Sequence, residues 1–186
     1  MLPPLEHLDP ARFDAPAILK RLVGAHRGLA ELKGVAASMP NQGILISALG
    51  LQEAKDSSEI ENIVTTHDEL FREAALSEAA ASAAAKEVAR YRQALGVGYA
   101  AVRNSGLLTT NHILTVQAEL EQNRAGLRKL PGTVLKDGAG FIVYTPPAPD
   151  MLPSLMADLD RFINDPAVFA ADPLVKMALI HHQFES

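Results

Sequence analysis

Only one stretch of this chain has the residue pattern of β-strands. Residues 132–145 place two β-prone runs on either side of Asp137-Gly138, a dipeptide that favours a hairpin turn. Pro146-Pro147 ends the second run because proline cannot donate to a strand ladder. The sequence therefore predicts an all-α fold that contains one β-hairpin.

Helical patterns occupy most of the remaining sequence. Apolar residues at alternating spacings of four and three predict a helix over about 15–38, while residues 44–62 fit either two short helices or one broken helix. Residues 66–103 are rich in strong helix formers and predict a long helix. Three later helices are expected to begin at capping residues, which are Thr109 or Thr110, then Asp150, then Asp172 with Pro173.

The length of 186 residues suits one domain or a large fragment of one. Residues 1–14 are rich in proline and predict an irregular N-terminal arm. Residues 15–125 form the expected N-terminal helical region, and residues 126–186 hold the hairpin and the helices that follow it. The core is expected to include Leu155, Leu159 and Phe162.

Composition excludes several classes of function. The net charge is −5 and the basic residues are dispersed, which argues against nucleic-acid binding. The chain has no cysteine and no signal-peptide pattern, and its apolar runs fall short of the roughly 20 residues that a membrane span needs. A cytoplasmic protein with no membrane contact is therefore expected.

Several motifs follow one another in a fixed order. Ser57-Ser58-Glu59-Ile60-Glu61-Asn62 matches [S/T]xxxE[G/N], and TxxEL follows at residues 66–70. PGT and YTPP flank the hairpin at residues 131–147, LMxDLxxFIND occupies 155–165 and DPLxxxALxHxQFE occupies 172–185. This series, over residues 40–186, resembles Fic proteins, the enzymes that transfer AMP from ATP to protein hydroxyls.

The resemblance implies that catalysis depends on a motif absent from this sequence. In the family, HPFx[D/E]GNGRxxR supplies the histidine that deprotonates a Ser, Thr or Tyr hydroxyl, the acid that holds Mg²⁺ and the turn that cradles phosphate oxygens. Neither His181 nor His182 is followed by Pro-Phe. The chain is therefore expected to stop about one residue before the catalytic histidine, to hold no catalytic residue, metal or cofactor, and to be inactive alone. ATP and Mg²⁺ are implied for the complete enzyme.

The resemblance assigns two roles to this chain, which are inhibition of the enzyme and binding of its target. By motif position Glu61 is the inhibitory glutamate, which pairs with the last arginine of the catalytic motif, with Ser57 and Asn62 beside it near the ATP. An Arg fork held bidentately by a carboxylate is not free to clamp a phosphate. The hairpin corresponds to the flap that holds a target segment by strand addition, through Thr133, Val134, Leu135, Val143 and Tyr144.

Two functions remain open at this point. The first is the regulatory N-terminal part of a Fic-type protein adenylyltransferase, inhibited through Glu61, whose partner is a protein that offers a hydroxyl side chain. The alternative is a stand-alone, antitoxin-like interaction protein that presents an inhibitory helix in trans. The oligomeric state is left open, with a homodimer as one option.

Overall fold

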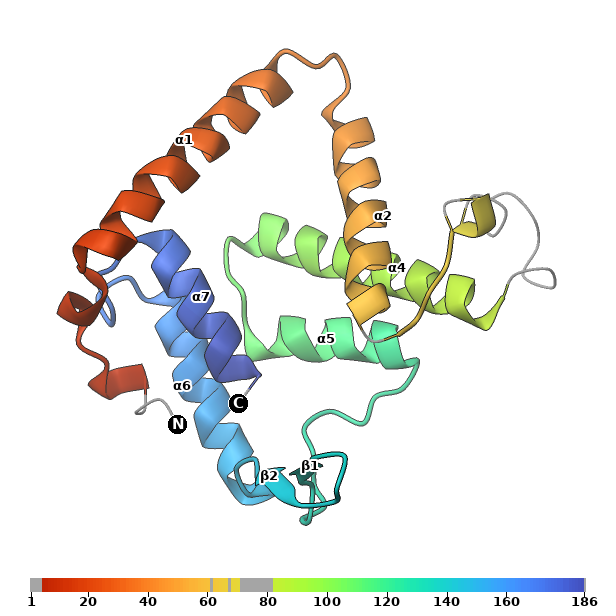
Figure 1. Cartoon of the computed structure of the whole chain (residues 1–186), viewed down its shortest axis with the longest axis vertical. Coiled ribbons are helices and arrows are strands. Elements are labelled where there is room, and N and C mark those ends of the chain that lie inside the picture. The colour runs from red at the N-terminus through yellow and green to blue at the C-terminus, as the bar shows by residue number, and fades with distance from the viewer. Residues whose placement is uncertain (1–4, 61, 67, 71–81, 186) are drawn as a thin grey trace. The chain divides into compact units, whose positions relative to one another are not determined.

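The structure is a computed structural model that describes residues 5–60, 62–66, 68–70 and 82–185. Helices dominate it, and its described strands are those of one two-stranded antiparallel sheet, which confirms the mainly all-α prediction (Figure 1). The chain divides into two compact units, and each is described by itself. The first consists of Met1–Arg27, Leu107–Asn111 and Ala125–Ser186, and the second of Gly28–Gly106 and His112–Arg124.

Helix α1 spans Pro16–Ala37, as the apolar spacing predicts. None of its side chains is buried, although its sequence carries an apolar stripe. Leu29 and Leu32 each keep about half of their surface exposed. The spacing of apolar residues thus predicted the helix, but it did not determine whether another element covers the apolar face.

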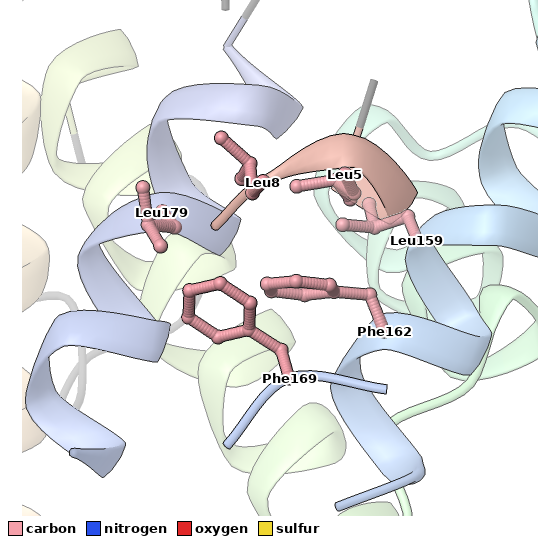
Figure 2. Close-up of a cluster of buried hydrophobic side chains, with 6 residues drawn as sticks. All are labelled: Leu5, Leu8, Leu159, Phe162, Phe169 and Leu179. Carbon is pink, nitrogen blue, oxygen red and sulfur yellow. The ribbon is translucent and has the colours of Figure 1, made fainter. Parts of the chain in front are cut away.

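The core of the first unit gathers side chains from four places in the sequence (Figure 2). Helix α6 (Leu152–Asn164) contributes Leu159 and Phe162, and helix α7 (Pro173–Phe184) contributes Leu179. The rings of Phe162 and Phe169 pack with their centroids 5.1 Å apart. Of the residues expected in the core, Leu159 and Phe162 are buried and Leu155 is half-buried.

The N-terminal arm completes this core. Leu5 and Leu8, both buried, lie in and just after the short 3-10 turn η1 (Leu5–His7), and a second turn, η2, spans Pro10–Phe13. Phe13 packs edge-on against Phe169, with ring centroids 6.0 Å apart. The arm was expected to be irregular, but its leucines have a hydrophobic surface to bury, and that burial orders the chain around them.

The helices of the first unit begin in different ways. Asp172 accepts a hydrogen bond from the Leu174 N–H at 2.9 Å, which confirms it as the N-cap of α7. The expectation that Asp150 caps α6 is wrong. Asp150 lies inside the 3-10 turn η4 (Pro149–Met151), which runs directly into α6, so the first turn of α6 continues a preceding turn and needs no side-chain cap.

The second unit contains α2 (Gln42–Ile60), α4 (Ala83–Ser105) and most of α5 (Thr110–Glu121). Its buried apolar residues are Ala54, Leu70, Ala85, Val88 and Ala94. Helices α4 and α5 approach closely at Gly98, where an added Cβ would lie 2.8 Å from Val116 Cγ2.

The long helix expected over residues 66–103 is interrupted. Ser82 has extended dihedrals (φ −65°, ψ 158°), and its hydroxyl accepts a hydrogen bond from the Ala85 N–H, so α4 starts anew at Ala83. A serine competes with helix continuation because its side chain can cap a new first turn. The predicted helical run of alanines spans residues 74–85. Its part from 74 to 81 lies outside the described residues.

Candidate functional site

The [S/T]xxxE[G/N] motif lies at the C-terminal end of α2. The sequence predicted two short helices or one broken helix in this region. Both predictions are wrong, because α2 is continuous from Gln42 to Ile60. Ser57 is half-buried and its hydroxyl donates to Glu53 Oε1 at 2.8 Å, one turn earlier. Glu61 lies outside the described residues, so its predicted inhibitory role stays a prediction.

Asn62 ends the helix through its backbone conformation. Its φ is +63°, in the left-handed region that glycine and asparagine adopt most readily. The Asn62 N–H donates to the Glu59 carbonyl and the Ile63 N–H to the Ser58 carbonyl, both at 3.0 Å, which is the Schellman pattern of helix termination. The restriction of this motif position to Gly or Asn therefore has a structural cause.

The TxxEL stretch that follows starts the next helical segment, at residues 68–70. The Glu69 N–H donates to the Thr66 hydroxyl at 3.2 Å, and the Thr66 N–H donates to Glu69 Oε2 at 3.0 Å. These reciprocal bonds form a capping box, which satisfies two backbone donors at a helix start. Leu70, the last residue of the motif, is buried in the core of this unit.

The hairpin in the first unit pairs β1 (Leu135–Lys136) with β2 (Ile142–Tyr144). Asp137 organises the turn: its Oδ1 accepts from the N–H groups of Ala139 and Phe141, and its carbonyl accepts from the Gly140 N–H at 3.0 Å. Gly140 has φ +87°, so the turn needs a residue without a Cβ there. The Asp-Gly signal predicted the hairpin correctly, but Gly140 takes the left-handed position.

The predicted flap residues are divided between the strands and the segment before them. Thr133 and Val134 precede β1, Leu135 begins it, and Val143 and Tyr144 lie in β2, where Tyr144 pairs with Leu135. Leu135 and Val143 expose 60% and 58% of their surface, enough for direct contact with another chain. Their role in holding a target remains a prediction.

A mostly apolar pocket of about 420 Å³ lies beside the hairpin within the same unit. Its wall includes Thr133 and Tyr144 from the hairpin region, and Leu155 and Leu159 from α6. Arg128 Nη2 donates to the Pro147 carbonyl at 2.6 Å and so fastens the Pro-Pro segment at its rim. The pocket gives this unit a concave apolar surface next to an exposed strand.

Two residues of the LMxDLxxFIND motif hold a loop that is distant in sequence, a role that sequence reasoning missed. Asn164 bonds to the backbone of Leu108, and Asp160 Oδ2 accepts from the Thr110 N–H at 2.9 Å. The carboxylate thereby satisfies a donor at the first residue of α5. Acid and amide side chains on the α6 face nearest this loop were the signal available in the sequence.

One ion pair joins α1 to the start of α7. His26 Nε2 donates to Asp172 Oδ2 at 2.7 Å. This hydrogen bond, together with the one from the Leu174 N–H, holds the pKa of Asp172 below its ordinary value. His26 and Asp172 keep 49% and 26% of their side chains exposed, so the pair resembles a surface salt bridge in strength.

The described residues place no three His, Asp or Glu side chains together where they could hold a metal ion. Likewise, no helix in the described part of the chain combines the length and apolarity that crossing a bilayer requires.

Comparison with protein families agrees with the motif order at the front of the chain. Residues 19–100 match the Fic/DOC family N-terminal model, a range that includes nearly all of α1, the whole of α2 with its motif, the capping box and most of α4. The hairpin, α6 and α7 lie after the matched range, so their likeness to the family depends on the motifs quoted above. Residues 19–100 of this chain are therefore similar to the N-terminal region of Fic/DOC family proteins.

Proposed function

We propose that this chain is the regulatory N-terminal part of a Fic-type protein adenylyltransferase and that Glu61 is its inhibitory residue. The observation that carries the proposal is the family match over residues 19–100, which contains the complete motif from Ser57 to Asn62. Transfer of AMP joins a target hydroxyl oxygen to the α-phosphorus of ATP and releases pyrophosphate. The groups for that step belong to the motif HPFx[D/E]GNGRxxR, so the chain alone binds ATP weakly and transfers no AMP.

Inhibition would act through one arginine of that motif. A carboxylate that binds the guanidinium in a bidentate fashion removes the fork that would otherwise hold the γ-phosphate, and its charge repels the nucleotide. Such a carboxylate acts only if the backbone that carries it is held in place. The hydrogen bonds of Asn62 and Ile63 back to Glu59 and Ser58 support the proposal, because they fasten the helix end that flanks position 61.

Target binding would use the hairpin. An extended segment of the target pairs with an exposed strand edge, so the backbone supplies affinity and the side chains supply selectivity. The exposure of Leu135 and Val143 supports this role, since both side chains are free to meet a partner. The partner is a protein that brings a Ser, Thr or Tyr hydroxyl to the transferred phosphate.

The test extends the chain through an HPFx[D/E]GNGRxxR segment and measures incorporation of labelled AMP into protein. Glu61→Gly should raise activity by orders of magnitude, because each charge-assisted bond it frees contributes roughly 1.5 to 3 kcal/mol. Ser57→Ala should have a smaller effect. Glu59→Ala is the matched control: it removes a carboxylate two residues away whose ion pair with Lys55 lies at the surface and contributes little to stability.

Equal activity of the extended wild type and its Glu61→Gly variant, with both folded, would remove the inhibitory assignment. If the 186-residue chain instead silenced a separately produced Fic enzyme through Glu61, the antitoxin-like alternative would replace action in cis.

A further inference from the structure

The β-hairpin is too short to hold its own orientation. Strand β1 has two residues and β2 has three, and their register shifts between Leu135 and Lys136. A lone two-stranded hairpin is at best marginally stable in water. The hydrogen bonds of Asp137 hold the tip, but they lie far along the hairpin from its open end, where both strands join the rest of the unit. Contacts at that open end therefore decide where the hairpin points.

One hydrogen bond crosses the open end. Arg128 precedes the hairpin and Pro147 follows it, 19 positions later, and Arg128 Nη2 donates to the Pro147 carbonyl at 2.6 Å. Both residues are half-buried. Because a guanidinium is always charged, this bond is charge-assisted, and such bonds are shorter and stronger than those between neutral groups. Its acceptor is a backbone carbonyl, so the bond does not depend on the protonation of an acid.

The acceptor side of this bond is itself held. The ring of Pro147 fixes its φ angle, and its carbonyl is the one hydrogen-bonding group of its backbone. The turn η4 (Pro149–Met151) starts two positions later and runs directly into α6. Arg128 and Pro147 also line the same 420 Å³ pocket as Leu155 of α6. The bond therefore ties the segment that enters the hairpin to a segment that is continuous with α6.

We propose that Arg128 is a positioning residue, which sets the direction in which the hairpin presents its exposed strands. With the bond in place, the hairpin and α6 are held together. Without it, the hairpin pivots about the two segments that connect it to the unit. The consequence for target binding rests on the proposed function, since strand addition is favoured by an edge that is already held in one orientation. The effect on the hairpin itself does not.

The 186-residue chain tests this effect by NMR relaxation. Arg128→Ala should lower the ¹⁵N order parameters of the Leu135 and Val143 amides from about 0.85, the value of rigid backbone, to below about 0.6. The amides of α6 should keep their values, which a general loss of stability would not allow. Arg128→Lys keeps a charged donor but loses the planar fork, so it should give intermediate values.

Lys129→Ala is the matched control, because it removes the same charge from the adjacent, exposed position. It should leave all of these order parameters unchanged. Hairpin order parameters in Arg128→Ala equal to those of the wild type would overturn the proposal, and so would an equal loss in Lys129→Ala.

A second measurement uses the native chain and needs no substitution. The guanidinium protons of Arg128 should exchange with water more slowly than those of Arg124, whose side chain is exposed. Equal exchange rates would show that the bond to Pro147 does not form in solution, and this would also overturn the proposal. The comparison decides the question even if Arg128→Ala does not fold.

The extended chain described under the proposed function tests the consequence for targets. Arg128→Ala should raise the KM for a protein target about tenfold, a change within reach of one lost charge-assisted hydrogen bond. The kcat and the KM for ATP should change far less, and a fall in kcat at constant target KM would contradict a positioning role. Lower hairpin order parameters with an unchanged target KM would refute target binding by the hairpin, whereas the positioning of the hairpin by Arg128 would stand.

Discussion

The side chain of Asn164 holds the backbone of Leu108 by both of its polar groups. Its Nδ2 donates to the Leu108 carbonyl at 2.8 Å and its Oδ1 accepts from the Leu108 N–H at 2.9 Å. The same Nδ2 also donates to Asp160, which in turn accepts from Thr110. One amide on α6 thus fixes the loop that leads into α5.

Replacing Asn164 with alanine should therefore destabilise the fold. The change leaves the half-buried N–H and carbonyl of Leu108 without partners, at a cost of about 1 to 3 kcal/mol in the free energy of unfolding. Urea denaturation followed by circular dichroism measures it. Asn104→Ala, at an exposed position in the last turn of α4, is the control and should stay within about 0.5 kcal/mol of wild type. Equal stability of the two variants would contradict the anchoring role.

Two glycines on α4 should respond in opposite directions to the same substitution. Gly98→Ala places a Cβ 2.8 Å from Val116 Cγ2, so it should cost about 1 to 3 kcal/mol through overpacking. Gly96→Ala meets nothing within 4 Å and should stabilise by roughly 0.5 to 1 kcal/mol, because alanine loses less entropy in a helix. Thermal unfolding of the pair is the measurement. Recovery of Gly98→Ala by Val116→Ala would locate the clash, and a stabilising Gly98→Ala would refute it.

Asn62 should tolerate glycine but not a β-branched residue. Its φ of +63° costs roughly 1 to 2 kcal/mol for an ordinary L-residue, so Asn62→Val should lose about that much stability and Asn62→Gly should lose almost none. Chemical denaturation distinguishes the two. Glu59→Val adds the same side chain within the helix, at a position with ordinary helical geometry, and should cost less than Asn62→Val.

The Asp172 carboxylate should contribute to stability in a defined range of pH. Its pKa in the folded protein is lowered, first by the His26 hydrogen bond and then by that of the Leu174 N–H. The contribution is therefore present above the ordinary aspartate pKa and is lost as the pH falls through the lowered value.

Carboxyl ¹³C NMR titration follows this pKa directly. In His26→Ala the pKa of Asp172 should rise toward its ordinary value without reaching it, since the Leu174 bond remains. His181→Ala, at an exposed position on α7, should leave it unchanged. An Asp172 pKa that is the same in wild type and His26→Ala would show that the ion pair does not form in solution.

Sequence patterns predicted the elements that depend on local interactions. The apolar spacing gave α1 to within about a residue, Asp172 gave the start of α7, and Asp137-Gly138 gave the hairpin. Each is encoded by residues within a few positions of one another. The turn differed in detail because the left-handed conformation fell on Gly140, a choice made by the hydrogen bonds to Asp137.

Features set by contacts distant in sequence were not predictable in this way. Leu5 and Leu8 pack on α6 and α7 from an arm whose prolines predicted irregular structure. The hydrogen bonds between Asn164 and Leu108 join residues 56 positions apart, and no local sequence pattern predicts them. For the candidate site, the motif identified Ser57 and Asn62, but the bond of Ser57 to Glu53 and the burial of Ser58 became visible only with the packing of α2.

A stop signal and a start signal stand four positions apart in this chain, at Asn62 and Thr66. An α2 longer by a single turn would consume the residues that open the next helical segment, and a later start would leave Leu70 without its place in the core. The position of the motif along the chain is therefore fixed, on its C-terminal side, by a helix stop and a helix start. Insertions or deletions between the two signals should disturb this part of the molecule more than most substitutions within α2.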